Sequence, residues 1–363
     1  MEKGNLILAA GGTGGHIFPA QALAEELAKK NYTPILITDK RYLRYASQSQ
    51  NPKKEFITAG TPYARGAKKL LSLSLILGGV IKSIFLLKKY KPKAVIGFGG
   101  YPAFPTLYAA KLLKIPIIIH EQNSALGRVN KYFIKIAKAI AISFEPTAGL
   151  NDVEKEKVIL TGNPVRKAIL AISKNPYPEI TDRLNILVIG GSQGASIFSE
   201  VVPNALASLP QEMQTKIKIT QQCIVEDIEK VRSIYQKTDL DVELAAFFND
   251  MHLKLKEAHL VISRSGASTI SELQVAARPA IIVPIPYSFD NHQMHNARSF
   301  VANETGWIIP QDNFTPQKLA EKIKTFVLDP QILKESAKKF KANEILAVES
   351  LLNVIENVIN DKS

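Results

Sequence analysis

The sequence predicts an α/β protein built from two Rossmann-like, doubly wound halves, and three observations support this prediction. Short apolar runs rich in β-branched residues alternate with longer amphipathic stretches along the whole chain, as they do in parallel βαβ units. Two of these runs, one in each half, lead directly into glycine-rich loops. With 363 residues, of which 46% are hydrophobic, the chain is long enough to bury two separate cores.

The apolar runs define the expected strands, and the segments between them have the length and periodicity of helices. The expected strands are Asn5–Ala10, Pro34–Thr38, Ala94–Phe98, Ile115–Ile119, Ala139–Ser143, Asn185–Gly190, Ile217–Gln221, Val242–Ala246, Leu260–Ser263 and Ala280–Pro284. Lys338–Ile359 has apolar positions spaced by three and four, which predicts a C-terminal helix. Because ligands of doubly wound sheets bind beyond the carboxyl ends of the strands, we expect functional residues in the loops that follow these runs.

A weak internal repeat indicates where the domains divide. Leu6–Gly15 and Ile186–Gly194 both run from an apolar strand into a glycine loop. The chain is expected to cross between domains at the turn Gly162–Pro164 or in the polar, proline-bearing stretch Ser173–Arg183 just after it. The expected divisions are an N-terminal domain, residues 1–163, a C-terminal domain, residues 164–340, and a terminal helix that packs back on the first domain, residues 341–363.

Positive charge is concentrated in the first domain. Residues 1–165 hold 24 Lys and Arg against 10 Asp and Glu, whereas the rest of the chain holds 22 against 23. A general lysine bias would affect both halves alike, so the surplus favours an anionic partner for the first half, such as lipid headgroups, nucleic acid or an acidic substrate. The single cysteine, Cys223, excludes an intramolecular disulfide, and the first apolar run is too short for a signal peptide.

Four loops rich in glycine or serine follow expected strands. They are Gly11–Gly15, Gly97–Pro102, Gly190–Gly194 and Ser263–Thr269. Backbone N–H groups in such loops, together with the positive end of the following helix, bind phosphate. Neither Gly11–Gly15 nor Gly190–Gly194 continues with the G-x-G-x-x-G spacing of dinucleotide sites or the Lys-Ser/Thr ending of a P-loop, which disfavours a nicotinamide oxidoreductase. Tight turns also use glycine, but four loops at strand ends favour a phosphate-bearing ligand.

Side chains beside these loops suggest chemistry. His16 directly follows the first loop at an expected helix start, where a neutral imidazole could accept a proton from an attacking hydroxyl, although a structural role fits the position equally well. Glu272 lies one turn into the helix after Ser263–Thr269 and could bind both hydroxyls of a ribose; the alternative is a serine-capped helix with a solvated glutamate. The polar run Asp290–Ala297 follows a strand and is expected to lie at the same edge of the sheet.

Taken in order, these motifs resemble those of the MurG family, peptidoglycan glycosyltransferases that add N-acetylglucosamine (GlcNAc) to lipid I to make lipid II. The matching stretches are Gly11–His16, Gly97–Pro102, His120–Asn123, Gly162–Arg166, Gly190–Ala195, Arg264–Glu272 and Asp290–Ala297. The resemblance implies a GT-B fold with an interdomain cleft, UDP-GlcNAc held mainly by the C-terminal domain, and the undecaprenyl-linked acceptor held by the N-terminal domain. It implies no cofactor, and a role in cell-wall synthesis, cell shape and cell division alongside other proteins of those processes.

The resemblance also implies roles for individual residues. His16 corresponds to the favoured general base, and His292 stands where some relatives have glutamine. The expected donor contacts from the first domain are Thr13, Gly14 and Gly15, with Asn123 and Arg166 expected to contact the donor from the interdomain side. Those from the second are Ser192, Ala267, Ser268 and Thr269 at the phosphates, Ile270 and Ser271 in the same helix, Glu272 at the ribose, Phe248 through its backbone at the uracil, and His292 and Gln293 at the sugar.

The implied reaction is a single inverting displacement in which helix N-termini and loop amides, without a metal, stabilise the charge on the leaving UDP. A D-x-D pattern of the kind that binds Mn²⁺ or Mg²⁺ does occur at Asp239–Asp241. It precedes the expected strand Val242–Ala246 and lies away from the glycine loops, so we interpret it as a solvated turn.

The segment Leu70–Ile81 is uncharged and largely apolar over 12 residues, too short to span a bilayer, which needs about 20. Lysines flank it at positions 68, 69, 82, 88, 89, 91 and 93. An apolar face with a basic rim predicts an interfacial segment, and so peripheral association with the anionic cytoplasmic face of the bacterial plasma (inner) membrane. A buried helix with a lysine-rich exit would give the same pattern.

Three other functions are alternatives to this prediction of a MurG-like glycosyltransferase. A diacylglycerol glycosyltransferase would share the donor loops and the apolar segment but differ around Gly97–Pro105 and His120–Asn123. A UDP-GlcNAc 2-epimerase would share the two-domain architecture but needs more acid–base groups around the sugar. A nucleic-acid binder is disfavoured, because the basic half has no recognised nucleic-acid motif and no basic stripe interleaved with aromatic residues.

Overall fold

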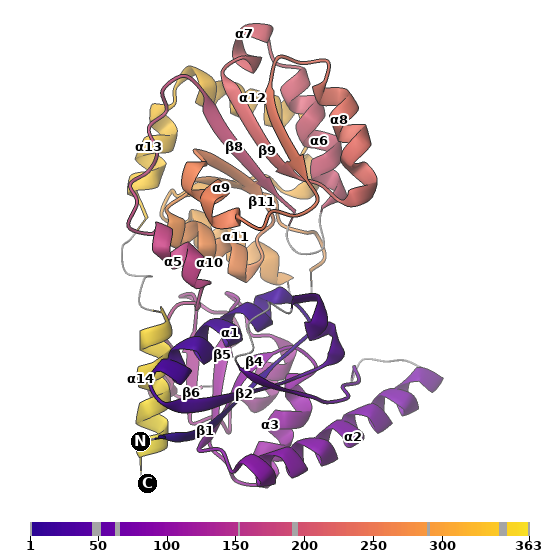
Figure 1. Cartoon of the computed structure of the whole chain (residues 1–363), viewed down its shortest axis with the longest axis vertical. Helices are drawn as coiled ribbons and strands as arrows, with labels where there is room; N and C mark the ends of the chain where they lie inside the picture. Colours follow the sequence, from indigo (N-terminus) through magenta and orange to yellow (C-terminus); the bar gives the residue numbers. More distant parts are fainter. Residues whose placement is uncertain are drawn as a thin grey trace. The chain divides into compact units, whose positions relative to one another are not determined.

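The computed structural model describes residues 2–45, 52–61, 66–151, 153–190, 195–288, 291–340 and 347–361. The chain forms two compact units (Figure 1). Unit 1 comprises Met1–Arg166 and Leu346–Ser363, and unit 2 comprises Lys167–Ile345. Each unit is an α/β fold with a parallel sheet and hydrophobic packing of its own, so the predicted fold class is confirmed.

Unit 1 contains a seven-stranded parallel sheet in the order β3-β2-β1-β4-β5-β6-β7. Its strands are β1 (Gly4–Ala10), β2 (Tyr32–Thr38), β3 (Lys53–Phe56), β4 (Ala94–Gly99), β5 (Ile117–Glu121), β6 (Ala139–Ile142) and β7 (Val158–Leu160). Its helices are α1 (Gly14–Lys29), α2 (Ala67–Tyr90), α3 (Ala103–Leu112), α4 (Arg128–Phe133) and α14 (Ala347–Asn360). The strand order reverses between β1 and β4, which is where ligands bind in doubly wound sheets.

Alternate residues of each strand in unit 1 supply two hydrophobic cores on opposite faces of the sheet. On one face, Leu6 and Leu8 of β1 pack with α1 and with Leu351 and Ile355 of α14 (Figure 1). On the other face, Ile7 and Ala9 of β1 pack with α2, α3 and α4. The last helix of the chain is therefore part of the N-terminal unit.

Unit 2 contains a six-stranded parallel sheet in the order β10-β9-β8-β11-β12-β13. Its strands are β8 (Leu184–Ile189), β9 (Ile217–Gln222), β10 (Asp241–Ala245), β11 (Leu260–Ser263), β12 (Ala280–Ile282) and β13 (Gly306–Ile308). Its helices are α5 (Lys167–Ile172), α6 (Ser196–Ala207), α7 (Gln211–Gln214), α8 (Ile228–Tyr235), α9 (Met251–Glu257), α10 (Ala267–Ala276), α11 (His292–Val301), α12 (Pro316–Leu328) and α13 (Gln331–Lys338). Here the strand order reverses between β8 and β11.

All ten expected strands are confirmed, with shifts of one or two residues at several ends. Three short strands were not expected: β3, β7 and β13. Each is an edge strand of three or four residues whose side chains are all partly or fully exposed, so none shows the alternation that marks a half-buried strand. The single C-terminal helix expected from Lys338 is wrong at its start, because Lys338 ends α13 in unit 2 and α14 begins at Ala347 in unit 1.

Helix α2 packs on unit 1 through a narrow face and extends to one side of the sheet (Figure 1). Gly79 permits the contact, because a Cβ there would lie 2.2 Å from the Thr58 carbonyl oxygen. Ser83 is fully buried, and its hydroxyl lies 3.2 Å from that of Thr106 in α3. The outward face carries exposed apolar side chains: Leu70, Leu71, Leu73, Leu75, Leu77, Ile81 and Phe85.

Candidate active site

Two glycine loops of unit 1 interlock at the point where the strand order reverses. The first follows β1 and the second follows β4, and these strands are neighbours. A Cβ at Gly11 would lie 2.4 Å from the Pro102 ring, and a Cβ at Gly100 would lie 2.3 Å from the Gly11 carbonyl oxygen. Gly100 also has a φ of +76°, which disfavours residues with a side chain. Glycine is therefore needed here for close backbone packing, whatever the loops bind.

His16 lies at the third position of α1, directly above this junction. Its ring rests on the second loop, where a Cβ on Gly99 or Gly100 would approach ring carbons Cε1 or Cδ2 at 3.4 and 3.2 Å. Its Nδ1 lies 2.8 Å from Oε1 of Gln122, just past the end of β5. No role was predicted for Gln122, because the contact joins residues 106 positions apart in the chain.

Behind Gln122 lies a second, fully buried histidine, His120. Its Nδ1 is 2.9 Å from Nε2 of Gln122, and its Nε2 is 3.2 Å from the Gly162 carbonyl oxygen. Burial, with a smaller contribution from the nearby His16, lowers the pKa of His120 to about 4, against the opposing effect of its hydrogen bond to Gly162. His120 is therefore neutral at physiological pH.

The other predicted residues of unit 1 lie at the start of α1 and in the segments that follow β5 and β7. Thr13 is the N-cap residue of α1, with extended backbone, and Gly14 and Gly15 form the first turn of the helix. A Cβ on Gly14 would lie 2.8 Å from the Phe18 ring, whereas Gly15 faces open space apart from the Thr13 hydroxyl. Arg166 stacks its guanidinium 5.4 Å from the centre of the Phe18 ring. Asn123 follows β5 and is held by Glu121.

In unit 2 the predicted phosphate and ribose residues lie at the N-terminus of α10, beyond the end of β11. Ser268, Thr269 and Glu272 occupy its half-exposed face. The remaining three residues of that group are buried: Ala267, Ile270 and Ser271. The Ser271 hydroxyl donates within the helix, to the Ala267 carbonyl oxygen. Because these three side chains are buried, mainly their backbone is available to a ligand.

A hydrogen-bonded cluster connects α11 with the loops that follow β11 and β12. Gln293 is largely buried, and its Oε1 accepts from the Ile285 backbone N–H at 3.0 Å and from the Ser265 hydroxyl at 3.3 Å. Asn296, which is fully buried, donates to the Ser265 carbonyl oxygen at 3.0 Å. His292 is the first residue of α11. Gln293 is thus fixed within the unit through its carbonyl oxygen.

Three further predictions have different outcomes in the structure. Ser192 and Asp290 lie outside the described residues. The side chain of Phe248 is buried, with the Lys254 ammonium 5.7 Å from its ring centre, so Phe248 has mainly its backbone to offer a ligand. Asp239 and Asp241 lie at the amino end of β10, and Asp241 pairs with Arg183 at 2.6 Å.

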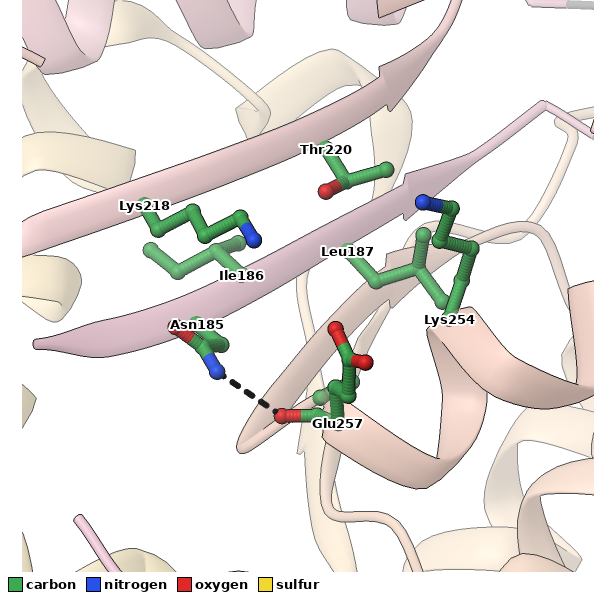
Figure 2. A pocket seen from close by; sticks show the side chains of 8 residues that line it. Asn185, Ile186, Leu187, Lys218, Thr220, Lys254 and Glu257 are labelled. Atoms are coloured by element: carbon green, nitrogen blue, oxygen red, sulfur yellow. Dashed lines mark hydrogen bonds between the residues drawn. The ribbon is translucent and has the colours of Figure 1, made fainter. Parts of the chain in front are cut away.

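Concave surfaces elsewhere on unit 2 do not coincide with these loops. Figure 2 shows a crevice between β8, β9 and α9 near the amino ends of the strands, where Asn185 donates to the Glu257 carbonyl oxygen. Its volume of about 10 Å³ holds no more than a water molecule. A groove of about 770 Å³ beside Trp307 and Ile332 contains none of the predicted site residues.

Two Rossmann-like units, each with polar residues beyond the carboxyl ends of its parallel strands, form the GT-B architecture found in one class of glycosyltransferases. The glycosyltransferase family 28 N-terminal domain matches residues 6–142, and the family 28 C-terminal domain matches residues 185–352. The chain therefore belongs to glycosyltransferase family 28 and, by its full-length relatives, to the MurG branch of that family.

These relatives match the chain over nearly its whole length. A protein of Rickettsia bellii named UDP-N-acetylglucosamine–N-acetylmuramyl-(pentapeptide) pyrophosphoryl-undecaprenol N-acetylglucosamine transferase is 42% identical over 357 residues, which cover 98% of this chain and 99% of that protein. The crystal structure of MurG from Acinetobacter baumannii has a TM-score of 0.79 at 29% identity, covering 98% and 99% of the two chains. A UDP-GlcNAc 2-epimerase from Neisseria meningitidis has a TM-score of 0.68 at 14% identity, covering 97% and 100%, and shares the fold alone.

Proposed function

We propose that this protein transfers GlcNAc from UDP-GlcNAc to the muramyl sugar of undecaprenyl-linked lipid I, giving lipid II. The structural observation that carries the proposal is His16, placed at the first strand-to-helix turn with Nδ1 engaged by Gln122. Relatives that match this protein over nearly its whole length have this activity in their names. The same fold in a UDP-GlcNAc 2-epimerase does not favour epimerisation here, because identity of 14% supports the fold only.

The proposed reaction is one in-line displacement at the anomeric carbon. The acceptor's 4-hydroxyl attacks that carbon while its proton moves to Nε2 of His16, and the bond from the anomeric carbon to the UDP oxygen breaks. Negative charge then develops on the diphosphate. The first-turn amides of α10, including that of Ser268, and the hydroxyl of Thr269 are suited to stabilise it, and Glu272 one turn later is suited to bind the ribose hydroxyls.

Association with the membrane is the second part of the proposal. Within the described residues one helical stretch, Lys69–Tyr90, is long and apolar enough to cross a bilayer; its most apolar 18 residues have a mean hydropathy of 2.2, and 33% of that segment is buried. However, α2 also packs on α3, and lysines such as Lys82, Lys88 and Lys89 are exposed along it. A one-sided apolar surface with a basic rim fits a helix that lies in the headgroup region of an anionic leaflet. The proposed location is therefore peripheral, at the cytoplasmic face of the plasma membrane.

The deciding experiment mixes the purified protein with labelled UDP-GlcNAc and lipid I in detergent, without added metal. We expect one labelled GlcNAc per lipid I and an inverted anomeric configuration. Transfer to diacylglycerol in place of lipid I, or conversion of UDP-GlcNAc to its 2-epimer without any acceptor, would overturn the proposal. In the same assay His16→Ala should lower kcat by about 100-fold or more while UDP binding changes little, since general-base catalysis typically contributes 10²–10⁴.

A further inference from the structure

A continuous chain of hydrogen bonds runs inward from His16. Nδ1 of His16 meets Oε1 of Gln122 at 2.8 Å, and Nε2 of Gln122 meets Nδ1 of His120 at 2.9 Å. Nε2 of His120 then meets the Gly162 carbonyl oxygen at 3.2 Å. Gln122 and His120 are both fully buried, so water does not compete for these contacts.

The direction of each hydrogen bond in this chain follows from two backbone carbonyl oxygens, which can only accept. Nε2 of Gln122 lies 3.0 Å from the His120 carbonyl oxygen as well as near the His120 ring. Rotating the amide by half a turn would place its oxygen against that carbonyl, so the amide nitrogen must face His120 and the amide oxygen must face His16. An amide oxygen also only accepts, and therefore Nδ1 of His16 must carry a proton.

The innermost hydrogen bond, between His120 and Gly162, gives the same direction independently. Because the Gly162 carbonyl oxygen accepts, Nε2 of His120 carries the proton and Nδ1 of His120 is left as the acceptor for Gln122. A protonated His120 could not accept at Nδ1. Burial keeps this ring neutral, with its pKa lowered to about 4, so the arrangement persists at physiological pH.

We propose that Gln122 and His120 are positioning residues that hold His16 in the tautomer with its proton on Nδ1 and its lone pair on Nε2. A free histidine in water favours the opposite tautomer, with the proton on Nε2, and in that form Nε2 cannot accept a proton from a substrate hydroxyl. The part of this inference that concerns catalysis rests on the proposed function of His16 as the general base. The tautomer itself does not depend on that function.

Neighbouring groups hold both rings of this chain in place. The His16 ring rests on the backbone of Gly99 and Gly100, as described above, which leaves Nδ1 toward Gln122. The His120 ring lies against Phe98, with ring centroids 5.3 Å apart. Asn130 donates to the His120 carbonyl oxygen at 3.2 Å, which fixes the acceptor that sets the Gln122 amide. The arrangement resembles a catalytic triad in its logic, with a neutral amide in the position of the carboxylate.

The direct test is ¹⁵N NMR of the histidine rings in the full-length protein without substrate, since ¹⁵N shifts distinguish protonated from unprotonated ring nitrogens. The chain has six histidines, and the His16 signals are assigned by their loss in His16→Ala. We expect the wild-type His16 to be protonated on Nδ1 and His120 on Nε2. In Gln122→Met, which is similar in size but offers no amide oxygen, His16 should shift to the Nε2-protonated form.

Kinetics then test the consequence for turnover. Gln122→Met should lower kcat by about 10- to 100-fold, part of the usual contribution of a general base, while KM for UDP-GlcNAc stays within about twofold. Gln122→Glu keeps an acceptor oxygen beside Nδ1 of His16 and should retain the tautomer. Its second oxygen faces the His120 carbonyl oxygen, so this variant should be less stable than the wild type and recover only part of the kcat lost in Gln122→Met. At position 120, asparagine can offer its side-chain oxygen to Gln122 in place of Nδ1 of His120. His120→Asn should therefore retain more activity than His120→Leu.

A matched control separates positioning from general loss of packing. Gln221 in unit 2 is also fully buried, and it accepts from Tyr235 and donates to Phe198. Gln221→Met should leave the His16 signals unchanged. A wild-type His16 protonated on Nε2, or a folded Gln122→Met that keeps the Nδ1-protonated form and full kcat, would overturn the inference. The NMR measurement needs no lipid I, so it remains decisive even if the proposed transfer activity is not found.

Discussion

Glu121 binds Asn123 twice, since its Oε1 accepts the Asn123 backbone N–H at 3.0 Å and the side-chain amide at 3.1 Å. Its second oxygen, Oε2, accepts from the Gly127 backbone N–H at 2.9 Å and from Asn130 at 2.8 Å. Glu121 is 1% exposed, so four N–H donors replace the water around its carboxylate. This buried carboxylate therefore shapes the loop that presents Asn123.

Replacing Glu121 by glutamine should disorder that loop. The new amide nitrogen would face N–H donors that have lost their acceptor, and each buried donor left without a partner costs about 1–3 kcal/mol. We expect faster hydrogen–deuterium exchange at the Asn123 and Gly127 amides and a higher KM for UDP-GlcNAc. As a control, Glu304→Gln removes an exposed ion pair with Lys339, and because water and salt screen such pairs it should leave stability and exchange at these amides nearly unchanged. Unchanged exchange in Glu121→Gln would mean that the loop is held by other contacts.

Gly99 and Gly100 offer a second, internally controlled test. Both have positive φ, +85° and +76°, so alanine at either position costs about 1–2 kcal/mol of backbone strain. Only at Gly100 does the new Cβ also meet the backbone, at 2.3 Å from the Gly11 carbonyl oxygen; at Gly99 the nearest atoms are 3.4 Å away. Gly100→Ala should therefore displace the first loop and lower kcat well below that of Gly99→Ala. Equal activity in steady-state assays of the two variants would show that the loops do not need to interlock.

The sequence predicted most of the fold but only part of the site, for a physical reason. Buried strands such as Leu260–Ser263 have a local apolar signature, whereas β3 (Lys53–Phe56) is a half-exposed edge strand without one. His16 could be found because it follows a glycine loop in the chain. Its partner Gln122 could not, because the segments after β1 and β5 come together only in the folded sheet, where β4 separates the two strands, and no local pattern records the contact.

A pH-dependent loss of stability is predicted for unit 2 at His259, which is 2% exposed. Burial lowers its pKa from 6.5 to about 4, aided by the charges of Arg278 and Lys334 and opposed by its hydrogen bond to the Glu179 carbonyl. The unfolded chain binds a proton below pH 6.5 that the folded unit does not bind until about pH 4. The stability from keeping His259 neutral is thus complete above pH 6.5 and is lost as the pH falls toward 4, by about 2 kcal/mol at pH 5.

His259→Asn should reduce this pH dependence. An asparagine oxygen can accept the Asn185 backbone N–H that Nδ1 of His259 accepts at 2.8 Å, but it does not titrate. The measurement is urea unfolding at pH 7.5 and pH 5, followed by fluorescence of Trp307 in β13, the single tryptophan of the chain. If the wild type and the variant lose equal stability between the two pH values, His259 is not the responsible group.

The exposed apolar surface of α2 gives the last prediction. Leu70, Leu77 and Phe85 are 75%, 61% and 69% exposed, so replacing all three by serine removes little packing within unit 1. If these side chains enter a membrane, each contributes on the order of 1 kcal/mol by partial burial, and the triple variant should bind anionic liposomes about 100-fold more weakly. Unit 2 offers a control, because Val225 and Leu328 are similarly exposed at 69% and 65%, and their replacement by serine should leave liposome binding unchanged. Flotation assays at two salt concentrations would also reveal the contribution of the exposed lysines, since their attraction to anionic lipid weakens as salt rises. Undiminished binding by a folded triple variant would show that α2 is not the membrane-binding surface.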